Sequence, residues 1–217
     1  MKAITSLIYG MTKTMNNGPK LWNKLLDEAP KGSLLMGGAV IDWHLGHEAK
    51  DYDIFHTYKI GEPNIPGNWS LIQNYQEPNW ADAHENEYLQ GNDEHNNNPI
   101  SSVYEYIVDG IHKVQLIGVN YDDPSVHFKN FDHSLTLGKY SKTGLFIHKK
   151  VFDSIHSHVV EYVSKNKTAK AVARSFLRAR TKTKKYSGGQ DGNWAYKGFV
   201  SKPEPVEEPF WKIINAS

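Results

Sequence analysis

The sequence predicts an α/β (α+β) fold, a mixed sheet flanked by helices, with a small C-terminal helical appendage. Three observations predict it: β-rich runs alternate with short helical patterns, an Asp-Gly dipeptide separates two β-rich runs as in a hairpin, and two amphipathic helical patterns follow. A chain of 217 residues is long enough to bury a sizeable core. We expect a core domain over 1–148 with an acidic insertion at about 61–99, and a basic helical region with an extended tail over 149–217.

The first elements lead into a glycine pair. KLWNKLLDEAP (20–30) has leucines at helical spacing and a closing Pro30, so a short helix is expected. SLLMGGAV (33–40) reads as a buried strand that runs into Gly37 and Gly38. A helical turn to Gly46 and a second strand, DYDIFHTY (51–58), complete the order strand, Gly-Gly, helix, strand.

The remaining elements follow the same periodicities. The stretch from 61 to 99 predicts loops with a short helix near Trp80–Leu89, and 102–119 predicts a hairpin turning at Asp109-Gly110, with a central strand over 113–119. Two amphipathic helices are expected next, and the proline-rich tail is expected to run extended. The first helix carries Val151, Ile155, Val159 and Tyr162 on one stripe, whereas the second sets Lys167, Lys170, Arg174 and Arg178 opposite Ala169, Val172, Phe176 and Ala179.

Composition excludes several classes of protein. No apolar run approaches the roughly 18 residues that span a bilayer, so we expect no membrane association. The first twenty residues have no cleavage pattern behind their short apolar stretch, and we expect a cytoplasmic protein, in a bacterial or virus-infected cell. Cysteine is absent, which excludes disulfides, thiolate catalysis and cysteine-based zinc sites.

The net charge of +1 conceals a strong segregation of charge. Nine acids and no Lys or Arg lie between Lys59 and Lys113, whereas nine basic residues and no acid lie between Glu161 and Asp191. Such asymmetry favours a polyanionic ligand at the basic end, with a solvated helix face as the alternative.

The most informative stretch is GGAVIDWHLGHEAKDYDIFH, residues 37–56. It resembles the head domain of CCA-adding tRNA nucleotidyltransferases and bacterial poly(A) polymerases, in the DNA polymerase beta-like nucleotidyltransferase superfamily. The shared pattern is Gly-Gly-x-Val-Arg-Asp, a glycine four residues later, and Asp-x-Asp on the next strand. The matching positions are Gly37, Gly38, Val40, Asp42, Gly46, Asp51 and Asp53.

Elementary chemistry gives each part of the motif a role. Carboxylates two residues apart on a strand point to one face, so Asp51 and Asp53 are expected to be catalytic residues and to hold Mg²⁺ or Mn²⁺. Gly37 and Gly38 let the backbone approach phosphates without a Cβ. The resemblance adds Asp42 to the nucleotide-binding residues, and ATP or CTP is the expected substrate.

A looser likeness continues over residues 126–148, where Phe131-Asp132 replaces the family's Arg-Asp pair. Together with Lys185-Tyr186 and Lys197-Gly198-Phe199, it resembles a short viral or phage-type branch. Asp132 is a candidate catalytic residue that positions the nucleotide or completes the metal site; the alternative is a turn-capping residue. Tyr186, Trp194, Tyr196 and Phe199 are candidates for stacking on bases or for core packing.

Two positions depart from the family pattern. Ile41 stands where the family's arginine contacts the triphosphate, and Gln115 where a third carboxylate is expected. Compensation is expected from Asp132, or from Arg174 and Arg178 in place of the missing arginine. The residues predicted to face phosphate are Lys170, Arg174, Arg178 and Lys185.

The resemblance implies transfer of an NMP from an NTP to a hydroxyl group, at an RNA or tRNA 3′ end. Two alternatives remain open. One is a toxin-like enzyme that modifies a protein or small molecule, and the other is a degenerate member that only binds RNA or nucleotide.

Overall fold

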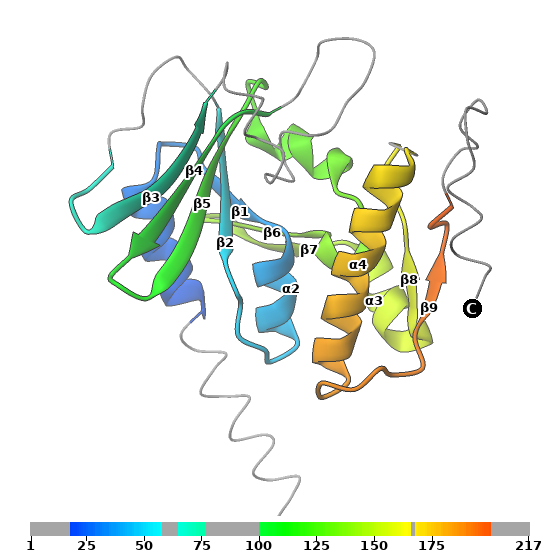
Figure 1. Cartoon of the computed structure of the whole chain (residues 1–217). Coiled ribbons are helices and arrows are strands. Elements are labelled where there is room, and N and C mark those ends of the chain that lie inside the picture. The colour runs from blue at the N-terminus through cyan, green and yellow to red at the C-terminus, as the bar shows by residue number, and fades with distance from the viewer. Residues whose placement is uncertain (1–17, 58–64, 77–99, 166–167, 201–217) are drawn as a thin grey trace, which may run out of the picture.

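The protein, a computed structural model, is described over residues 18–57, 65–76, 100–165 and 168–200. Its centre is a seven-stranded sheet in the order β3-β4-β5-β2-β1-β6-β7 (Figure 1). β2 and β5 pair in parallel and every other neighbouring pair is antiparallel, so the sheet is mixed, as the sequence predicts. The strands are β1 (Leu34–Met36), β2 (Tyr52–Thr57), β3 (Trp69–Gln76), β4 (Ile100–Val108), β5 (His112–Val119), β6 (Gly138–Ser141) and β7 (Gly144–Ile147).

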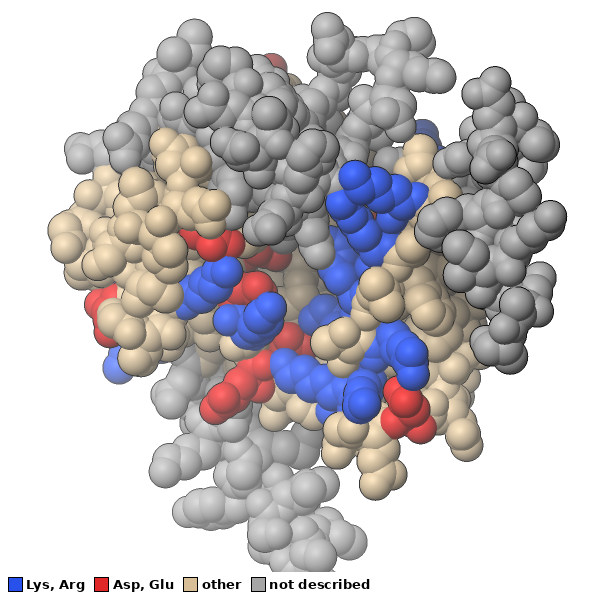
Figure 2. Space-filling model, in the orientation of Figure 1, with Lys and Arg blue, Asp and Glu red and all other residues tan. Residues whose placement is uncertain are grey.

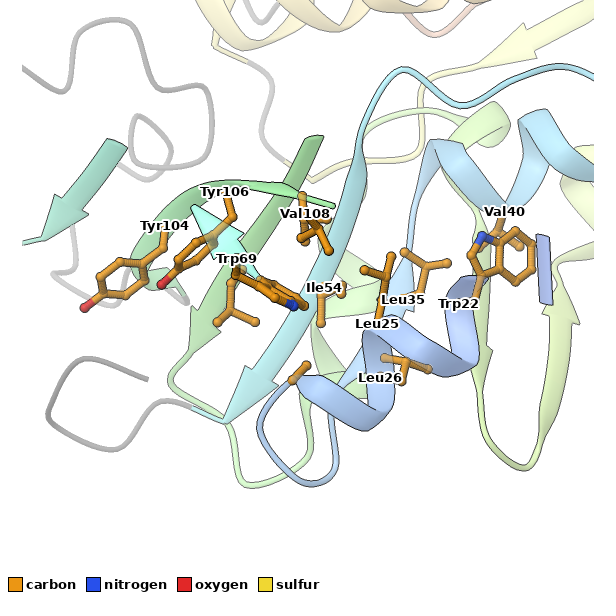
Figure 3. Close-up of a cluster of buried hydrophobic side chains, with 13 residues drawn as sticks. Trp22, Leu25, Leu26, Leu35, Val40, Ile54, Trp69, Tyr104, Tyr106 and Val108 are labelled. Atoms are coloured by element: carbon orange, nitrogen blue, oxygen red, sulfur yellow. The ribbon is translucent and has the colours of Figure 1, made fainter. Parts of the chain in front are cut away.

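The predicted helix before the glycine pair covers one face of the sheet. It spans residues 18–28 and buries Trp22, Leu25 and Leu26. Figure 3 shows Leu25 beside Leu35 and Ile54 of the sheet, and Trp22 beside Val40. Since alternate strand residues point to opposite faces, the residues next to Ile54, including Asp53, face the other side.

The second face carries a separate apolar cluster. Met36, Phe55 and Ile117 are fully buried there, with Phe128 and Phe131 packed against them. The two phenylalanines lie in and just after η2 (Pro124–Asn130), which is followed by η3 (Ser134–Thr136). This face therefore holds both apolar packing and the carboxylate strand.

The predicted hairpin is confirmed. β4 and β5 pair antiparallel, and the turn residues Asp109 and Gly110 have φ of 52° and 74°. Two successive positive φ angles suit a tight two-residue turn, which explains the Asp-Gly dipeptide. β5 lies between β4 and β2, inside the sheet as expected.

The loops expected between 61 and 99 are wrong at residues 69–76, which form strand β3 at the edge of the sheet. Pairing with β4 outweighs the low strand preference of this Asn- and Gln-containing segment. The rest of the interval from 77, with its expected helix near Trp80–Leu89, lies outside the described residues, as do Lys167 and the tail from 201.

The first C-terminal helix is shorter than predicted. α3 (Lys149–Ser157) ends because His158 adopts a left-handed conformation with φ 55°. Val159 therefore starts strand β8 (Val159–Glu161), and the expected helical stripe is wrong beyond Ile155. β8 pairs in parallel with β9 (Ala195–Lys197), a remote partner that periodicity does not show.

The second C-terminal helix agrees with the prediction. α4 (Ala169–Tyr186) is capped at its N-terminus by Thr168, whose hydroxyl accepts a hydrogen bond from the Ala171 amide at 3.3 Å. It buries Val172 and Ala179 on its apolar side. Within the described ranges, no helix has the length and apolar character needed to cross a membrane.

Candidate functional site

The diglycine bend lies directly against the carboxylate strand. Gly37 joins β1 to α2 (Gly38–His44) with φ 97° and ψ −146°, a conformation that only glycine adopts without strain. A Cβ on Gly37 would lie 3.3 Å from Asp53 Oδ2. The Gly37 amide donates to the Gly138 carbonyl at 2.8 Å, which fixes the bend to the start of β6. The structure thus brings together two motifs that lie about 15 residues apart in the sequence.

Asp51 and Asp53 stand at the start of β2. Asp51 immediately precedes the strand, Asp53 is its second residue, and both are half-buried. Tyr52 between them packs against the cluster on the helix 18–28 side. Strand alternation directs Asp53 to the other face, where it meets Gly37, and the two-residue spacing predicts the same face for Asp51.

This donor set suits Mg²⁺ or Mn²⁺. Mg²⁺ in nucleotide sites is commonly held by one or two carboxylates together with substrate phosphates and water. Among the described residues, no group of three or more His, Cys, Asp or Glu side chains is arranged to hold a metal. The two aspartates would therefore be the carboxylate share of a site that the nucleotide completes.

Gln115 lies beside Asp53, in register on β5, and Glu105 lies beside Gln115 on β4. The Gln115 amide nitrogen is 2.5 Å from Glu105 Oε1, and Lys113 Nζ lies 3.0 Å from the same oxygen. An ionised carboxylate only accepts hydrogen bonds, so the NH₂ group of Gln115 faces Glu105 and its carbonyl oxygen points elsewhere. The acid that the sequence lacks at position 115 is thus present one strand further from Asp53.

α4 docks on the glycine pair through Asp42. This carboxylate is 4% exposed and accepts from Lys182 at 3.0 Å, Lys185 at 3.1 Å and the Tyr186 hydroxyl at 2.7 Å. Burial and the nearby Asp42 charge raise the pKa of Tyr186 well above its usual value. A Cβ on Gly38 would lie 2.5 Å from Lys182 Nζ, so this ammonium group rests on the second glycine.

Asp132 forms a second junction with α4. Its carboxylate pairs with Arg178 and lies 3.9 Å from the Nε2 atom of fully buried His133. Burial alone would raise the pKa of Asp132, but His133 and Arg178 outweigh it and hold the pKa below its ordinary value. Asp132 therefore joins α4 to the segment after η2, and its part in positioning the nucleotide or completing the metal site stays a prediction.

The fold is partly similar to that of two solved CCA-adding enzymes. One, described as the complex of a CCA-adding enzyme with CTP, is 12% identical in sequence and has a TM-score of 0.42. The matched region includes 78% of this chain and 38% of that enzyme's chain. The other, a Thermotoga maritima CCA-adding enzyme complexed with tRNA, is 10% identical in sequence and has a TM-score of 0.47. The matched region includes 86% of this chain and 42% of that enzyme's chain.

The chain thus spans about two fifths of the length of these structures. No protein-family model matches the sequence, and no curated protein matches it. The predicted mixed α/β fold is confirmed by the seven-stranded sheet and its helices, whereas neither structure supports a viral or phage-type branch. At these TM-scores and identities, any assignment of activity depends on the chain's own residues.

The positive residues predicted to face phosphate occupy one side of α4. Figure 2 shows Lys and Arg side chains gathered along this helix, with Asp and Glu side chains on the neighbouring surface. Lys170 is exposed and Arg174 is half-buried. Lys185 contacts the buried carboxylate of Asp42 and Arg178 the half-buried carboxylate of Asp132, so part of the helix charge is balanced within the fold.

The aromatic candidates for base stacking pack mostly on one another. Tyr196 and Phe199 contact each other and Phe176 in edge-to-face geometry, with centroids 4.9–5.9 Å apart. The Trp194 indole donates to Ser187 at 3.0 Å. These contacts favour the core-packing interpretation.

The structure changes the interpretation of position 41 and adds one cation that the sequence did not single out. Ile41 is fully buried with Leu137 and Val151, so position 41 belongs to the core. The cation near the glycine pair is instead Lys182, which is 140 residues from Asp42. Lys182 follows Arg178 by four residues, so it lies on the same side of the helix as the predicted row of Lys170, Arg174 and Arg178 and could have been added to that row.

Proposed function

We propose that the protein is a metal-dependent nucleotidyltransferase that moves an NMP from an NTP to a hydroxyl group, with an RNA 3′ end as the acceptor. The observation that carries the proposal is the approach of Asp53 Oδ2 to Gly37, 3.3 Å from the position of a Cβ. A strand carboxylate beside a bend without side chains leaves room for phosphate next to a hard cation.

The proposed reaction is a simple displacement at phosphorus. The acceptor oxygen forms a bond to the α-phosphorus, the bond from that phosphorus to the bridging oxygen breaks, pyrophosphate leaves, and the hydroxyl proton passes to water. Asp51 and Asp53 would hold Mg²⁺ or Mn²⁺, which neutralises charge on the phosphates. The chain itself contributes the glycine bend, which admits the phosphates, and α4, which supplies positive charge.

Direct assay of transfer tests the proposal. The full chain is incubated with Mg²⁺ or Mn²⁺ and each α-labelled NTP, with and without bulk tRNA. We expect label on RNA, with ATP or CTP as donor. The D51N and D53N variants should lower the rate about 100-fold or more, because each removes a metal ligand.

The D153N variant is the matched control, since it makes the same change at an exposed position on α3 and should retain the rate. Label on protein instead of RNA would indicate the toxin-like alternative. An absence of transfer, together with RNA binding that weakens as salt rises, would indicate the degenerate binding protein that Ile41 and Gln115 suggest.

A further inference from the structure

Lys182 occupies the position nearest to the second glycine of the bend. Its Nζ and Cε atoms lie 2.5 Å and 2.9 Å from the place of a Gly38 Cβ. Asp53 occupies the corresponding position at Gly37. A carboxylate therefore lies against the first glycine and an ammonium group against the second, charges suited to a metal ion and to phosphate respectively.

Asp42 holds this ammonium group in place. Its Oδ1 atom accepts from both Lys182 and Tyr186, and its Oδ2 atom accepts from Lys185. Two ammonium groups share one buried carboxylate, so the cluster has a net positive charge beside the glycine pair. Asp42 is itself an anion surrounded by donors, and it would repel a phosphate that approached it directly.

The other cations of α4 are less available at this point. Lys185 Nζ also donates to the Glu48 carbonyl, and Arg178 pairs with Asp132 about one helical turn away. Lys182 has 18% side-chain exposure, less than Lys185 at 34% and Arg178 at 38%, but it is the side chain that lies against Gly38. Ile41 is buried in the core and supplies no charge.

We propose that Lys182 contacts the phosphate chain of the bound nucleotide at the diglycine bend, and that Asp42 is its positioning residue. This inference rests on the proposed function and adds a residue to the same site. Lys182 takes the place that the sequence analysis gave to Arg174 and Arg178, and Asp42 acts through Lys182 without touching the nucleotide.

Equilibrium binding to the full chain tests the inference, with ATP and inorganic tripolyphosphate as probes in the presence of Mg²⁺. K182M should weaken both probes by the same factor, about 10- to 100-fold, because it removes a charge-assisted hydrogen bond to phosphate. The control K184M makes the same change at an exposed position of the same helix and should alter binding less than about twofold. K182R keeps the charge and should retain most of the affinity.

The D42N variant separates positioning from simple electrostatics by the sign of its effect. Removing a negative charge near a phosphate site would tighten tripolyphosphate binding if Asp42 acted only through its field. If Asp42 positions Lys182, D42N weakens binding, and adding K182M to D42N causes little further loss. Thermal unfolding of each variant reports whether the fold is retained.

The outcomes distinguish this inference from the proposed function. Equal binding by folded K182M and K184M, a loss confined to ATP, or tighter binding by D42N would overturn the inference, even with wild-type transfer and its dependence on Asp53 intact. Wild-type protein that binds tripolyphosphate through Lys182 but transfers no label would overturn the proposed function and support the phosphate contact.

Discussion

At the scale of single residues, Gly37 combines two constraints that are separable by mutation. Its φ of 97° excludes other residues on conformational grounds, and its missing Cβ makes room for Asp53. Gly32 shares the first constraint, with φ 86°, but a Cβ there meets nothing within 4 Å. Comparing alanine substitutions at Gly37 and Gly32 therefore separates the effect of backbone strain from the effect of displacing the Asp53 carboxylate.

We expect G37A to lower the free energy of unfolding by about 1–3 kcal/mol and to weaken Mn²⁺ binding strongly, because the new methyl group displaces Asp53. G32A should show a comparable loss of stability with unchanged metal affinity. Urea denaturation and Mn²⁺ titration measure the two effects. Unchanged metal affinity in folded G37A would contradict the proposed closeness of the bend and the metal site.

Gln115 and Glu105 form a pair whose order is testable. Q115E sets two carboxylates face to face where the amide nitrogen now lies 2.5 Å from Glu105 Oε1. We expect a loss of about 1–3 kcal/mol in the free energy of unfolding, reduced by the nearby Lys113. The double variant Q115E/E105Q restores an acid-amide pair in the reverse order and should recover most of this loss.

The measurement for this pair is a double-mutant cycle by urea denaturation at pH 7, with E105Q as the fourth corner. If the stability changes of Q115E and E105Q simply add in the double variant, Gln115 and Glu105 do not interact, and their hydrogen bond does not explain the amide at position 115.

The candidate site was predictable only where local sequence determines it. Gly37, Gly38 and Asp53 lie within one strand-helix-strand unit, so alternation along β2 and the glycine bend suffice to bring them together. Lys182 reaches the same place through the docking of a helix far along the chain. Periodicity identifies the basic side of α4 but not the carboxylates that this side meets.

At the scale of elements, the hairpin, strands β1 and β2 and most of the helical residues follow from local pattern, whereas β3, β8 and β9 depend on remote partners. β8 and β9 pair with each other across α4, and β3 depends on β4. Each of these segments carries a weak pattern of its own, and pairing decides its conformation. This is why Val159 was assigned to a helix from its spacing alone.

The docking of α4 gives a prediction at this scale. R178M leaves Asp132 without its guanidinium partner at a site where the carboxylate is 16% exposed. Because Arg178 itself is 38% exposed, we expect a loss of about 1–2 kcal/mol rather than the larger cost of a fully buried pair. Faster hydrogen exchange along α4 should accompany it.

The R180M variant is the matched control. Its ion pair with Asp191 is 3.1 Å long and both side chains are more than half exposed, so its loss should stay below about 1 kcal/mol. Equal effects of R178M and R180M would mean that Asp132 does not fasten the helix.

At the scale of the whole molecule, the segregated charge of the sequence is partly neutralised by folding. Asp42 and Asp132 lie outside both charge blocks, yet they contact three of the basic residues of α4. The field that the helix offers to a polyanion is therefore weaker than the count of nine basic residues suggests. Its salt dependence should reflect mainly exposed side chains such as Lys170 and Arg180.

Buried histidines make the stability of the whole molecule depend on pH, and the pKa is lowered furthest at His127 and His133, with His56 as a third buried histidine of lowered pKa. His127 stacks on Phe55, with centroids 5.0 Å apart, and His133 is fully buried beside Asp132. Burial lowers the pKa of each to about 4, against an ordinary value of 6.5. Asp132 opposes the change at His133, while Arg178 and Lys182 add to it.

Between pH 6.5 and 4 the unfolded chain therefore binds more protons at these two residues than the folded protein does. Stability should be fully present above pH 6.5 and should fall as the pH approaches 4, by up to about 3 kcal/mol for each histidine. Urea denaturation over this range measures the slope of stability against pH.

H127L and H133L should each flatten this slope, whatever they do to stability at pH 7, whereas H156L, at an exposed position of α3, should leave it unchanged. His56 and His47, whose pKa values are also lowered by burial, should leave a smaller slope in the H127L/H133L double variant. A slope as steep in that variant as in the wild type would place the acid sensitivity elsewhere, because proton uptake by the two imidazoles would no longer link unfolding to pH.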